Sequence, residues 1–203
     1  MSQADGVSGI YKEATTLIGL RHKNIVDLYH AFVEGKDLIM IMELAEGGEL
    51  LKYVSDRGQL KEVDARKILL QICDAICTCH MQGIVHRDLK LENVLFKDTE
   101  DMYVKVIDFG ISGVCSTFKT DKVDAGTIAY MPPECFEDEP AMSAPSLDVW
   151  AIGLMFYAML YGTLPFNAGD DQAIKKKIKA AKINFPKNVP VTEKAKELLS
   201  LMM

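Results

Sequence analysis

The stretch His86-Arg87-Asp88-Leu89-Lys90-Leu91-Glu92-Asn93 organises the rest of the chain. About fifteen residues further on, the sequence carries Asp108-Phe109-Gly110. The first stretch holds an acid, a cation and an amide within a few residues, and the second adds another acid. A carboxylate that takes a proton, together with oxygen ligands for a metal ion, is the set of groups that phosphoryl transfer requires.

A short β-rich run precedes each stretch. Gly83-Ile84-Val85 comes before the first, and Tyr103-Val104-Lys105-Val106-Ile107 comes before the second. We therefore expect Asp88 and Asp108 to lie at strand-to-loop junctions that face one cleft. There Asp88 would accept a proton, while Asn93 and Asp108 would bind a metal ion.

The two stretches resemble the signature of the eukaryotic protein kinases, H-R-D-L-x-x-x-N followed by D-F-G. A third segment, Pro132-Pro133-Glu134, matches a further family motif. The resemblance implies an α+β, protein-kinase-like, two-lobed fold with a mostly helical large lobe. It also implies an enzyme that uses ATP and Mg²⁺ to phosphorylate proteins.

The resemblance extends to individual roles in this site. By resemblance, Asp88 accepts the proton of the substrate hydroxyl and Lys90 neutralises the transferring phosphoryl group, while Asn93 and Asp108 hold Mg²⁺. Thr127 resembles the residue that bonds Asp88 and Lys90. Lys90 also resembles the serine/threonine-specific form of this loop, which implies protein substrates with Ser or Thr.

Several residues resemble the nucleotide pocket of the family. Met42 resembles the residue that guards the back of the pocket. Glu43 and Ala45 resemble the hinge whose backbone hydrogen-bonds adenine. Leu50 and Leu95 resemble the residues that support the ring from below.

Two acidic residues relate to recognition of the protein substrate. Glu49 and Glu92 resemble acids that, in the calcium/calmodulin-dependent and related kinases, receive an arginine three residues before the target hydroxyl. The resemblance therefore implies substrates with an upstream basic residue. A solvated edge is the alternative interpretation of both glutamates.

Control elements are also recognisable. Glu13, in the pattern Glu-x-x-x-Leu-x-x-Leu-x-His-x-Asn-Ile-Val, resembles the acid of the family's control helix, whose usual partner is a strand lysine. Arg87 resembles the cation that pairs with a phosphorylated threonine of the activation segment. Val123 occupies that threonine's place here, so the partner of Arg87 stays open between nearby aspartates and Thr120. No regulatory partner protein is named by the sequence.

An apolar spine is implied by the same resemblance. Its expected members are Leu17, Leu28, His86 and Phe109. Asp148 resembles the buried acid that anchors the spine from a central helix. Plain core residues would look the same, so these positions support the fold more than the function.

Composition restricts the class of protein. The chain has 203 residues, 49% of them hydrophobic, which is enough for one packed core. Its formal net charge of −6 argues against nucleic acid and anionic membranes as partners. Ordinary solubility explains this acidic balance, and attraction of basic peptides is the alternative. Five cysteines without paired spacing favour a reducing, cytoplasmic location.

One cysteine cluster has a second interpretation. Cys73, Cys77 and His80 would share a helical face and would suit a metal ion. They also complete an apolar stripe, which favours buried thiols. The other members of that stripe are Ala65, Ile68, Leu69, Ile72 and Ile76.

No membrane attachment is expected. The first residues carry neither a basic region nor an apolar run of the kind that signals secretion or a lipid anchor. The uncharged segment from Val149 to Phe166 approaches the length of a membrane span, but Gly162 and Pro165 interrupt it. A buried core helix is the better interpretation.

The order of elements predicts one partial kinase domain. We expect a small-lobe remnant in residues 1–42, a hinge in residues 43–48 and a large lobe in residues 49–203. The remnant would contain one helix, from about Ser8 to Leu20, and a hairpin of two strands. The predicted strands are Ile25 to Phe32, Asp37 to Met42, Val94 to Phe96 and Val104 to Ile107. The predicted large-lobe helices are Glu49 to Ser55, Lys61 to Gln82, Asp148 to Tyr161, Asp170 to Ala181, and one capped by Thr192 that runs to Met203.

The sequence departs from the family pattern before Glu13. It shows neither a glycine-rich loop nor a strand lysine there, and Lys12 adjoins Glu13 on the same helix, where neighbouring side chains point in different directions. An incomplete active kinase, a pseudokinase and a protein-binding scaffold are the three explanations. We favour the first because the catalytic and metal-binding residues are intact. We expect little or no activity from residues 1–203 alone, because the loop and the lysine position and neutralise phosphates.

Overall fold

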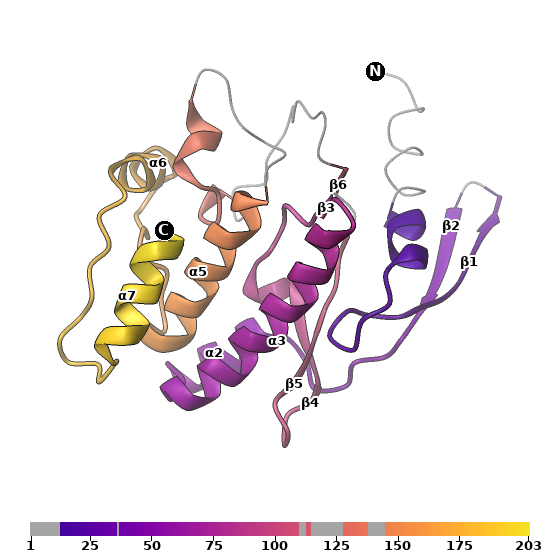
Figure 1. Cartoon of the computed structure of the whole chain (residues 1–203), viewed down its shortest axis with the longest axis horizontal. Helices are drawn as coiled ribbons and strands as arrows, with labels where there is room; N and C mark the ends of the chain where they lie inside the picture. Colours follow the sequence, from indigo (N-terminus) through magenta and orange to yellow (C-terminus); the bar gives the residue numbers. More distant parts are fainter. Residues whose placement is uncertain (1–12, 36, 110–112, 115–127, 138–144) are drawn as a thin grey trace.

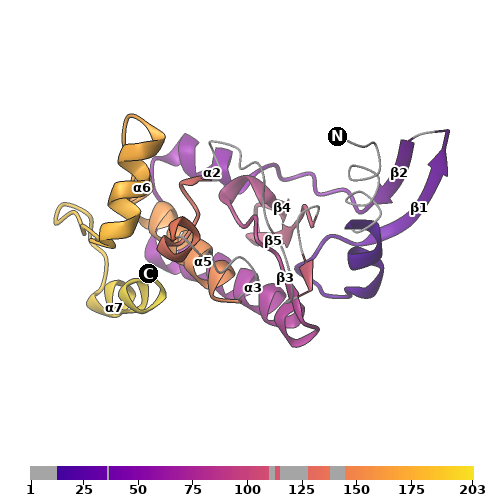
Figure 2. The ribbon, with the colours of Figure 1, turned by 90° about the horizontal axis from the view of Figure 1, so that it is seen from above.

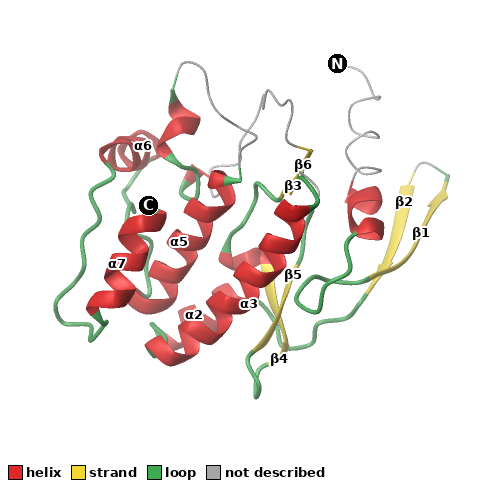
Figure 3. Ribbon diagram, viewed as in Figure 1, coloured by secondary structure: helices red, strands yellow, loops and turns green. Residues whose placement is uncertain are grey.

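The computed structural model describes residues 13–35, 37–109, 113–114, 128–137 and 145–203. Figure 1 shows a short helix and a β-hairpin at the N-terminal end, while helices dominate the remainder. Seen from above in Figure 2, this N-terminal part extends to one side of the helical part. The described residues form three two-stranded antiparallel sheets beside the helices (Figure 3), which confirms the predicted α+β class.

The N-terminal part contains a helix over residues 13–19 and strands β1 (Leu28–Glu34) and β2 (Asp37–Met42). The strands form the predicted hairpin, and Gly35 supplies the positive φ of 63° that its tight turn needs. The helix buries Ala14 and Leu17, Leu20 is buried just after its end, and its predicted start near Ser8 lies outside the described residues.

Strand β1 begins later than the predicted start at Ile25. Ile25 instead forms an isolated parallel bridge with Val106, and the N–H of Val26 donates to the carbonyl of Val106 at 3.0 Å. The segment is therefore an extra edge partner of β5 (Tyr103–Val106) and ties the N-terminal part to the helical part.

The glycine-containing linker lies against β4 (Val94–Asp98). Gly47 N–H donates to Phe96 O, and Phe96 N–H donates to Gly48 O, both at 2.8 Å. A Cβ on Gly47 would lie 2.5 Å from the Cβ of Phe96, so this close approach of two backbones requires glycine.

The helical part is built around two long helices that pack on each other, α3 and α5. Helix α3 also packs on β5, and α5 also packs on α7, while α6 lies beside the short 3₁₀ helix η2. Each predicted large-lobe helix is present with bounds within two residues of those expected, and η2 is an additional short helix. The bounds are α2 (Leu50–Arg57), α3 (Glu62–Met81), η2 (Pro133–Phe136), α5 (Ser146–Tyr161), α6 (Asp171–Ala180) and α7 (Glu193–Met202).

Side-chain caps explain where two of the helices begin. The hydroxyl oxygen of Thr192 accepts a hydrogen bond from Ala195 N–H at 3.3 Å, as the sequence predicted, and Asp170 accepts one from Ala173 N–H at 2.9 Å. Thr192 also contacts Glu62 through its N–H at 2.8 Å and its hydroxyl at 2.7 Å. The starts of α3 and α7 are therefore joined.

Helix α5 is the predicted core helix, buried on almost every side. It ends at Gly162, which has a φ of 73° and lies against the carbonyl of Gly58. Among the described residues, no helix combines the length and the apolar character that crossing a membrane requires.

The metal interpretation of the α3 cysteines is wrong. Within the described ranges, which include Cys73, Cys77 and His80, no three His, Cys, Asp or Glu side chains gather to hold a metal ion. Cys79 is fully buried, and burial raises the pKa of its thiol to about 12. His80 turns inward, where its Nε2 lies 2.7 Å from a carboxylate oxygen of Asp148.

Candidate active site

Short strands deliver the two motif stretches to one place. Strand β3 (Ile84–Val85) pairs with β6 (Gly113–Val114) and leads into the first stretch, while β5 leads into the second. The stretch then closes through the 3₁₀ helix η1 (Leu91–Asn93) into β4, which pairs with β5. Both aspartates thus follow strands, as predicted from the sequence pattern.

The first stretch folds around the carboxylate of Asp88. Lys90 Nζ lies 2.8 Å from Asp88 Oδ2, and Asn93 Nδ2 donates to the same oxygen at 3.0 Å. Asn93 Nδ2 also donates to the backbone carbonyl of Asp88 at 2.8 Å. Three residues named from the sequence are therefore in direct contact, and the orientation of the Asp88 carboxylate is defined from two sides.

Lys90 stays an ammonium ion in this setting. Burial alone would lower its pKa, but the hydrogen bond to Asp88 and the negative charges of Asp88, Glu92 and Asp108 raise the pKa above its ordinary value. The residue therefore brings a permanent positive charge to the carboxylate cluster. This also shows that Asp108 lies close enough to act on Lys90.

Asn93 and Asp108 fit a magnesium ion that is shared with a nucleotide. The Asn93 amide uses its nitrogen for both hydrogen bonds, so its oxygen is the atom suited to a metal, and Asp108 contributes an exposed carboxylate. The N–H of Ile107, next to Asp108, donates to the backbone carbonyl of Asn93 at 2.9 Å. Mg²⁺ prefers oxygen ligands. A protein usually supplies only one or two of them, and phosphates and water supply the rest.

His86 joins the two stretches. Its Nδ1 accepts a hydrogen bond from Asp88 N–H at 3.3 Å, so Nε2 carries the proton and donates to the carbonyl of Ile107 at 3.1 Å. The ring also packs on Phe109, with centroids 4.6 Å apart. His86 and Phe109 are both fully buried, which places this pair beneath the site.

Asp148, at the start of α5, holds the backbone of the first stretch. Its Oδ1 accepts from Arg87 N–H at 2.8 Å and its Oδ2 accepts from His86 N–H at 2.9 Å. The expected anchoring by Asp148 is therefore confirmed. Arg87 needs such anchoring, because its φ of 71° is unfavourable for a residue with a side chain.

Glu13 reaches the second stretch. Burial raises the pKa of its carboxyl, the charge of Asp108 raises that pKa further, and a hydrogen bond from the backbone of Phe109 acts in the opposite direction. The structure thus brings Glu13 to Asp108 and Phe109. Asp108 has a φ of 63° and Arg87 has a φ of 71°. Each of the two motif stretches therefore has one residue in a left-handed backbone conformation.

The expected nucleotide residues lie along the linker and β4. Met42 is 41% exposed at the end of β2, Ala45 is half-buried, and Leu95 is half-buried opposite Glu49 in an isolated bridge. Leu50 is fully buried at the start of α2, so its side chain is not exposed to a ligand in this structure.

Glu43 takes a role that the sequence did not suggest. Its backbone N–H donates to Asp27 O at 2.8 Å, so its carbonyl is the backbone group left for a base. Its side chain is buried and forms ion pairs with Lys97 and Lys105. Sequence reasoning missed both lysines. A lysine inside the apolar run of β5 was the signal that pointed to a buried charge partner.

The two acids expected to bind substrate lie on adjoining elements. Glu49 is exposed at the N-terminal boundary of α2, and Glu92 lies in η1, which packs against α2. Glu92 is half-buried, and its Oε2 is a buried atom without a hydrogen-bond partner among the described residues. Burying a carboxylate oxygen without a hydrogen-bond donor is unfavourable, and a cationic group of a bound ligand would offset that cost.

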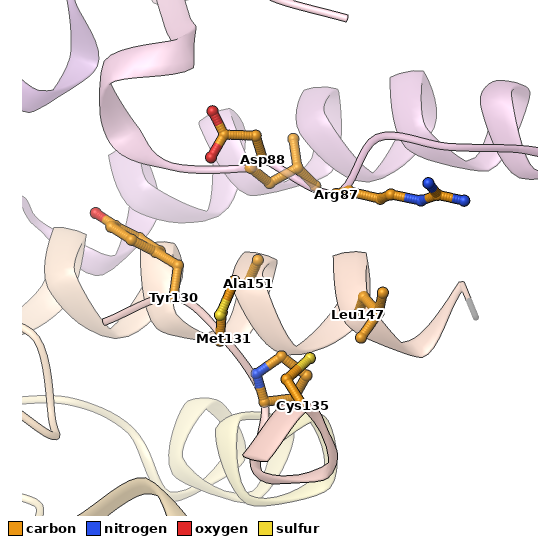
Figure 4. Close-up of a pocket in the computed structure, with 9 residues that line it drawn as sticks. Arg87, Asp88, Tyr130, Met131, Cys135, Leu147 and Ala151 are labelled. Atoms are coloured by element: carbon orange, nitrogen blue, oxygen red, sulfur yellow. The ribbon is translucent and has the colours of Figure 1, made fainter. Parts of the chain in front are cut away.

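Thr127 and most of the activation segment lie outside the described residues. Figure 4 shows what lies below Asp88: a pocket lined by the first stretch, by Tyr130, Met131 and Cys135, and by α5. The side chains of Asp88 and Arg87 point in different directions there. At about 30 Å³ the pocket has room for about one water molecule, so it is too small for a nucleotide.

Comparisons with known proteins agree with this arrangement. The protein kinase domain model matches residues 2–203. NUAK family SNF1-like kinase 1 of Mus musculus and of Homo sapiens are each 35% identical over 177 residues, which cover 87% of this chain and 26% of each relative. A CDPK-related protein kinase of Daucus carota is 35% identical over 208 residues, covering 100% of this chain and 34% of the relative. The chain thus spans about a quarter to a third of the length of these curated relatives, and it belongs to the protein kinase domain family.

Proposed function

We propose that the protein transfers a phosphoryl group from ATP to Ser or Thr hydroxyls of protein substrates. The observation that carries this proposal is the contact of Lys90 and Asn93 with one oxygen of Asp88, at 2.8 and 3.0 Å. Phosphoryl transfer needs an oriented acceptor for the hydroxyl proton and nearby positive charge, and few other reactions need both together.

Each residue has a defined part in this proposal. Asp88 orients the substrate hydroxyl and accepts its proton, while Lys90 offsets negative charge that develops on the transferring group. Asn93 and Asp108 present oxygen atoms to Mg²⁺, which bridges the nucleotide phosphates when bound. Asp148 keeps the first stretch in its strained conformation, so that these groups meet.

The nucleotide is proposed to lie between the linker and β4. Ala45 forms no backbone hydrogen bond within the described part of the chain, so its N–H and carbonyl are available to an adenine edge. Leu95 is half-buried and supplies an apolar surface on β4. We place Met42 at the back of this site and Leu50 beneath it.

The proposed substrates carry an arginine upstream of the target residue. Glu92 supports this, because its buried Oε2 has no hydrogen-bond partner within the described part of the chain, and Glu49 immediately precedes the adjoining helix α2. A guanidinium group would supply hydrogen bonds and opposite charge to both carboxylates.

Nucleotide binding tests the function first. Mg²⁺-ADP should raise the Tm of the purified chain, and Asp108→Asn should remove the Mg²⁺-dependent part of that rise. Asp56→Asn is the matched control, since Asp56 forms an exposed ion pair with Lys52, four residues away. An unchanged Tm in the parent would count against any nucleotide site.

Transfer is then measured with labelled Mg²⁺-ATP and a serine peptide that carries an upstream arginine. Phosphopeptide that forms with the parent and with Asp56→Asn, but not with Asp88→Asn, would establish the reaction. It would also overturn the expectation that residues 1–203 alone have little or no activity. Nucleotide binding with no transfer would agree with that expectation and would leave an incomplete kinase, a pseudokinase and a protein-binding scaffold as the explanations.

A further inference from the structure

A buried lysine lies between the linker and the second motif stretch. Lys105 is 3% exposed, and its Nζ lies 2.7 Å from Glu43 Oε2 and donates to the carbonyl of Ile25 at 3.2 Å. Lys105 lies on β5, three residues before Asp108, and Glu43 begins the linker. One ion pair thus connects the strand that carries a proposed metal ligand with the segment proposed to bind adenine.

Lys105 also lies on the face of the β4–β5 hairpin that is proposed to contact the adenine base. It pairs directly with Leu95 across the two strands, so the side chains of both residues project from the same face. Glu43 is drawn onto this face by Lys105 and, at its edge, by Lys97. The Glu43 carboxylate therefore ties the start of the linker to the β4–β5 hairpin, while the backbone bonds between Gly47, Gly48 and Phe96 tie its other end.

The two lysines differ sharply in their surroundings. The side chain of Lys97 is 46% exposed and that of Lys105 is 4% exposed, although they share one carboxylate. A buried ion pair costs desolvation that an apolar pair of similar volume avoids, so its presence is poorly explained by stability alone. What a buried pair does supply is one defined geometry, because neither charge tolerates losing its partner.

We propose that Lys105 is a positioning residue for the nucleotide site: by holding Glu43 against the β4–β5 hairpin, it fixes the linker backbone at Ala45 relative to Leu95. The expected effect on nucleotide binding rests on the proposed function, whereas the geometry of the linker is testable without a nucleotide.

The test compares three variants with the parent. Lys105→Met removes the buried charge, Lys97→Met removes the exposed charge from the same carboxylate, and Glu43→Gln/Lys105→Met removes both buried charges. The double variant guards against misfolding, because it leaves no unpaired buried charge; Lys97, which also loses Glu43, is 46% exposed. Stability is followed by Tm.

Hydrogen exchange measures the protection of the linker amides directly. Amide exchange at Glu43 and Gly47, whose N–H groups donate to the carbonyls of Asp27 and Phe96 at 2.8 Å, should accelerate about tenfold in Lys105→Met and less than about twofold in Lys97→Met, relative to α5 amides in the same sample. Referring the rates to α5 removes any general loss of stability. Equal linker rates in the parent and in Lys105→Met would overturn the proposal.

Ligand affinity separates positioning from general stability. The Kd for Mg²⁺-ADP should rise about tenfold in Lys105→Met and in the double variant, while the Kd for Mg²⁺-tripolyphosphate should change less than about twofold. A double variant with parental Tm and parental ADP affinity would overturn the proposal. Accelerated linker exchange in Lys105→Met, together with a parent that binds no ADP, would support the positioning of the linker and would count against the proposed function.

Discussion

The carboxylate of Asp148 accepts a hydrogen bond from the backbone N–H of Arg87 at 2.8 Å, across sixty-one positions of sequence. Asp148 is 1% exposed, and Arg87 has a left-handed φ of 71°. The central helix therefore holds a strained loop in the shape that gathers Asp88, Lys90 and Asn93. Loss of this acceptor should lower the free energy of unfolding and disturb the geometry of the site.

Asp148→Asn should lower the free energy of unfolding by about 2 kcal/mol, because an amide offers a single accepting oxygen to the nitrogen atoms of His80, His86 and Arg87 that surround the carboxylate. Urea unfolding measures the change. Asp56→Asn, in an exposed pair with Lys52, should cost less than about 0.5 kcal/mol. Equal losses in the two variants would contradict the anchoring role.

Gly162→Ala should be strongly destabilising. A Cβ at this position would lie 1.7 Å from the carbonyl oxygen of Gly58, and the φ of 73° is unfavourable for alanine. We expect a loss of more than about 2 kcal/mol in thermal or urea unfolding. Gly169→Ala is the control, since a Cβ there meets nothing within 4 Å. A Tm in Gly162→Ala equal to that of the control would show that the close approach of Gly58 and Gly162 is wrong.

The stability contributed by Glu43 should depend on pH. Burial alone would raise the pKa of Glu43, but hydrogen bonds from Lys105 and Lys97 outweigh burial and hold the pKa below the ordinary value of 4.5. The folded-state pKa is thus lower than the unfolded one. The contribution is therefore complete above the unfolded pKa and is lost as pH falls from there towards the folded pKa.

The measurement is the difference in free energy of unfolding between the parent and Glu43→Gln, taken from about pH 7 to about pH 3. The advantage of the parent should be constant near neutrality and should shrink below about pH 4.5. A difference that stays the same across this range would contradict the ion pairs at Glu43.

Glu92→Gln should weaken binding of peptides that carry an arginine three residues before the target serine. We expect the Kd to rise about tenfold, which corresponds to about 1.4 kcal/mol, because the guanidinium loses a charged acceptor. Fluorescence anisotropy measures binding. A peptide with alanine in place of the arginine should bind the parent and the variant alike, and Glu46→Gln on the exposed linker is the matched variant. Equal losses for both peptides would remove the specificity assigned to Glu92.

The chemistry of the site was predictable because its residues are close in sequence. Asp88, Lys90 and Asn93 lie within six residues of one another, so a short loop is enough to bring them together, and the motif identified them. Helix periodicity likewise predicted α3 and α5 closely, because both bury long apolar faces. The start of β1 was missed, since Ile25 pairs with a strand about eighty residues away.

Local pattern thus accounts for the family, the helices and the chemical identity of the site residues. The long-range partners arise only when the chain folds: Lys105 meets Glu43, and Asp148 meets Arg87, through contacts that span about sixty residues each. The physical reason is that an apolar or motif pattern specifies which face of an element is buried, whereas the partner of a buried charge depends on how separate elements pack. Those contacts give the site its geometry.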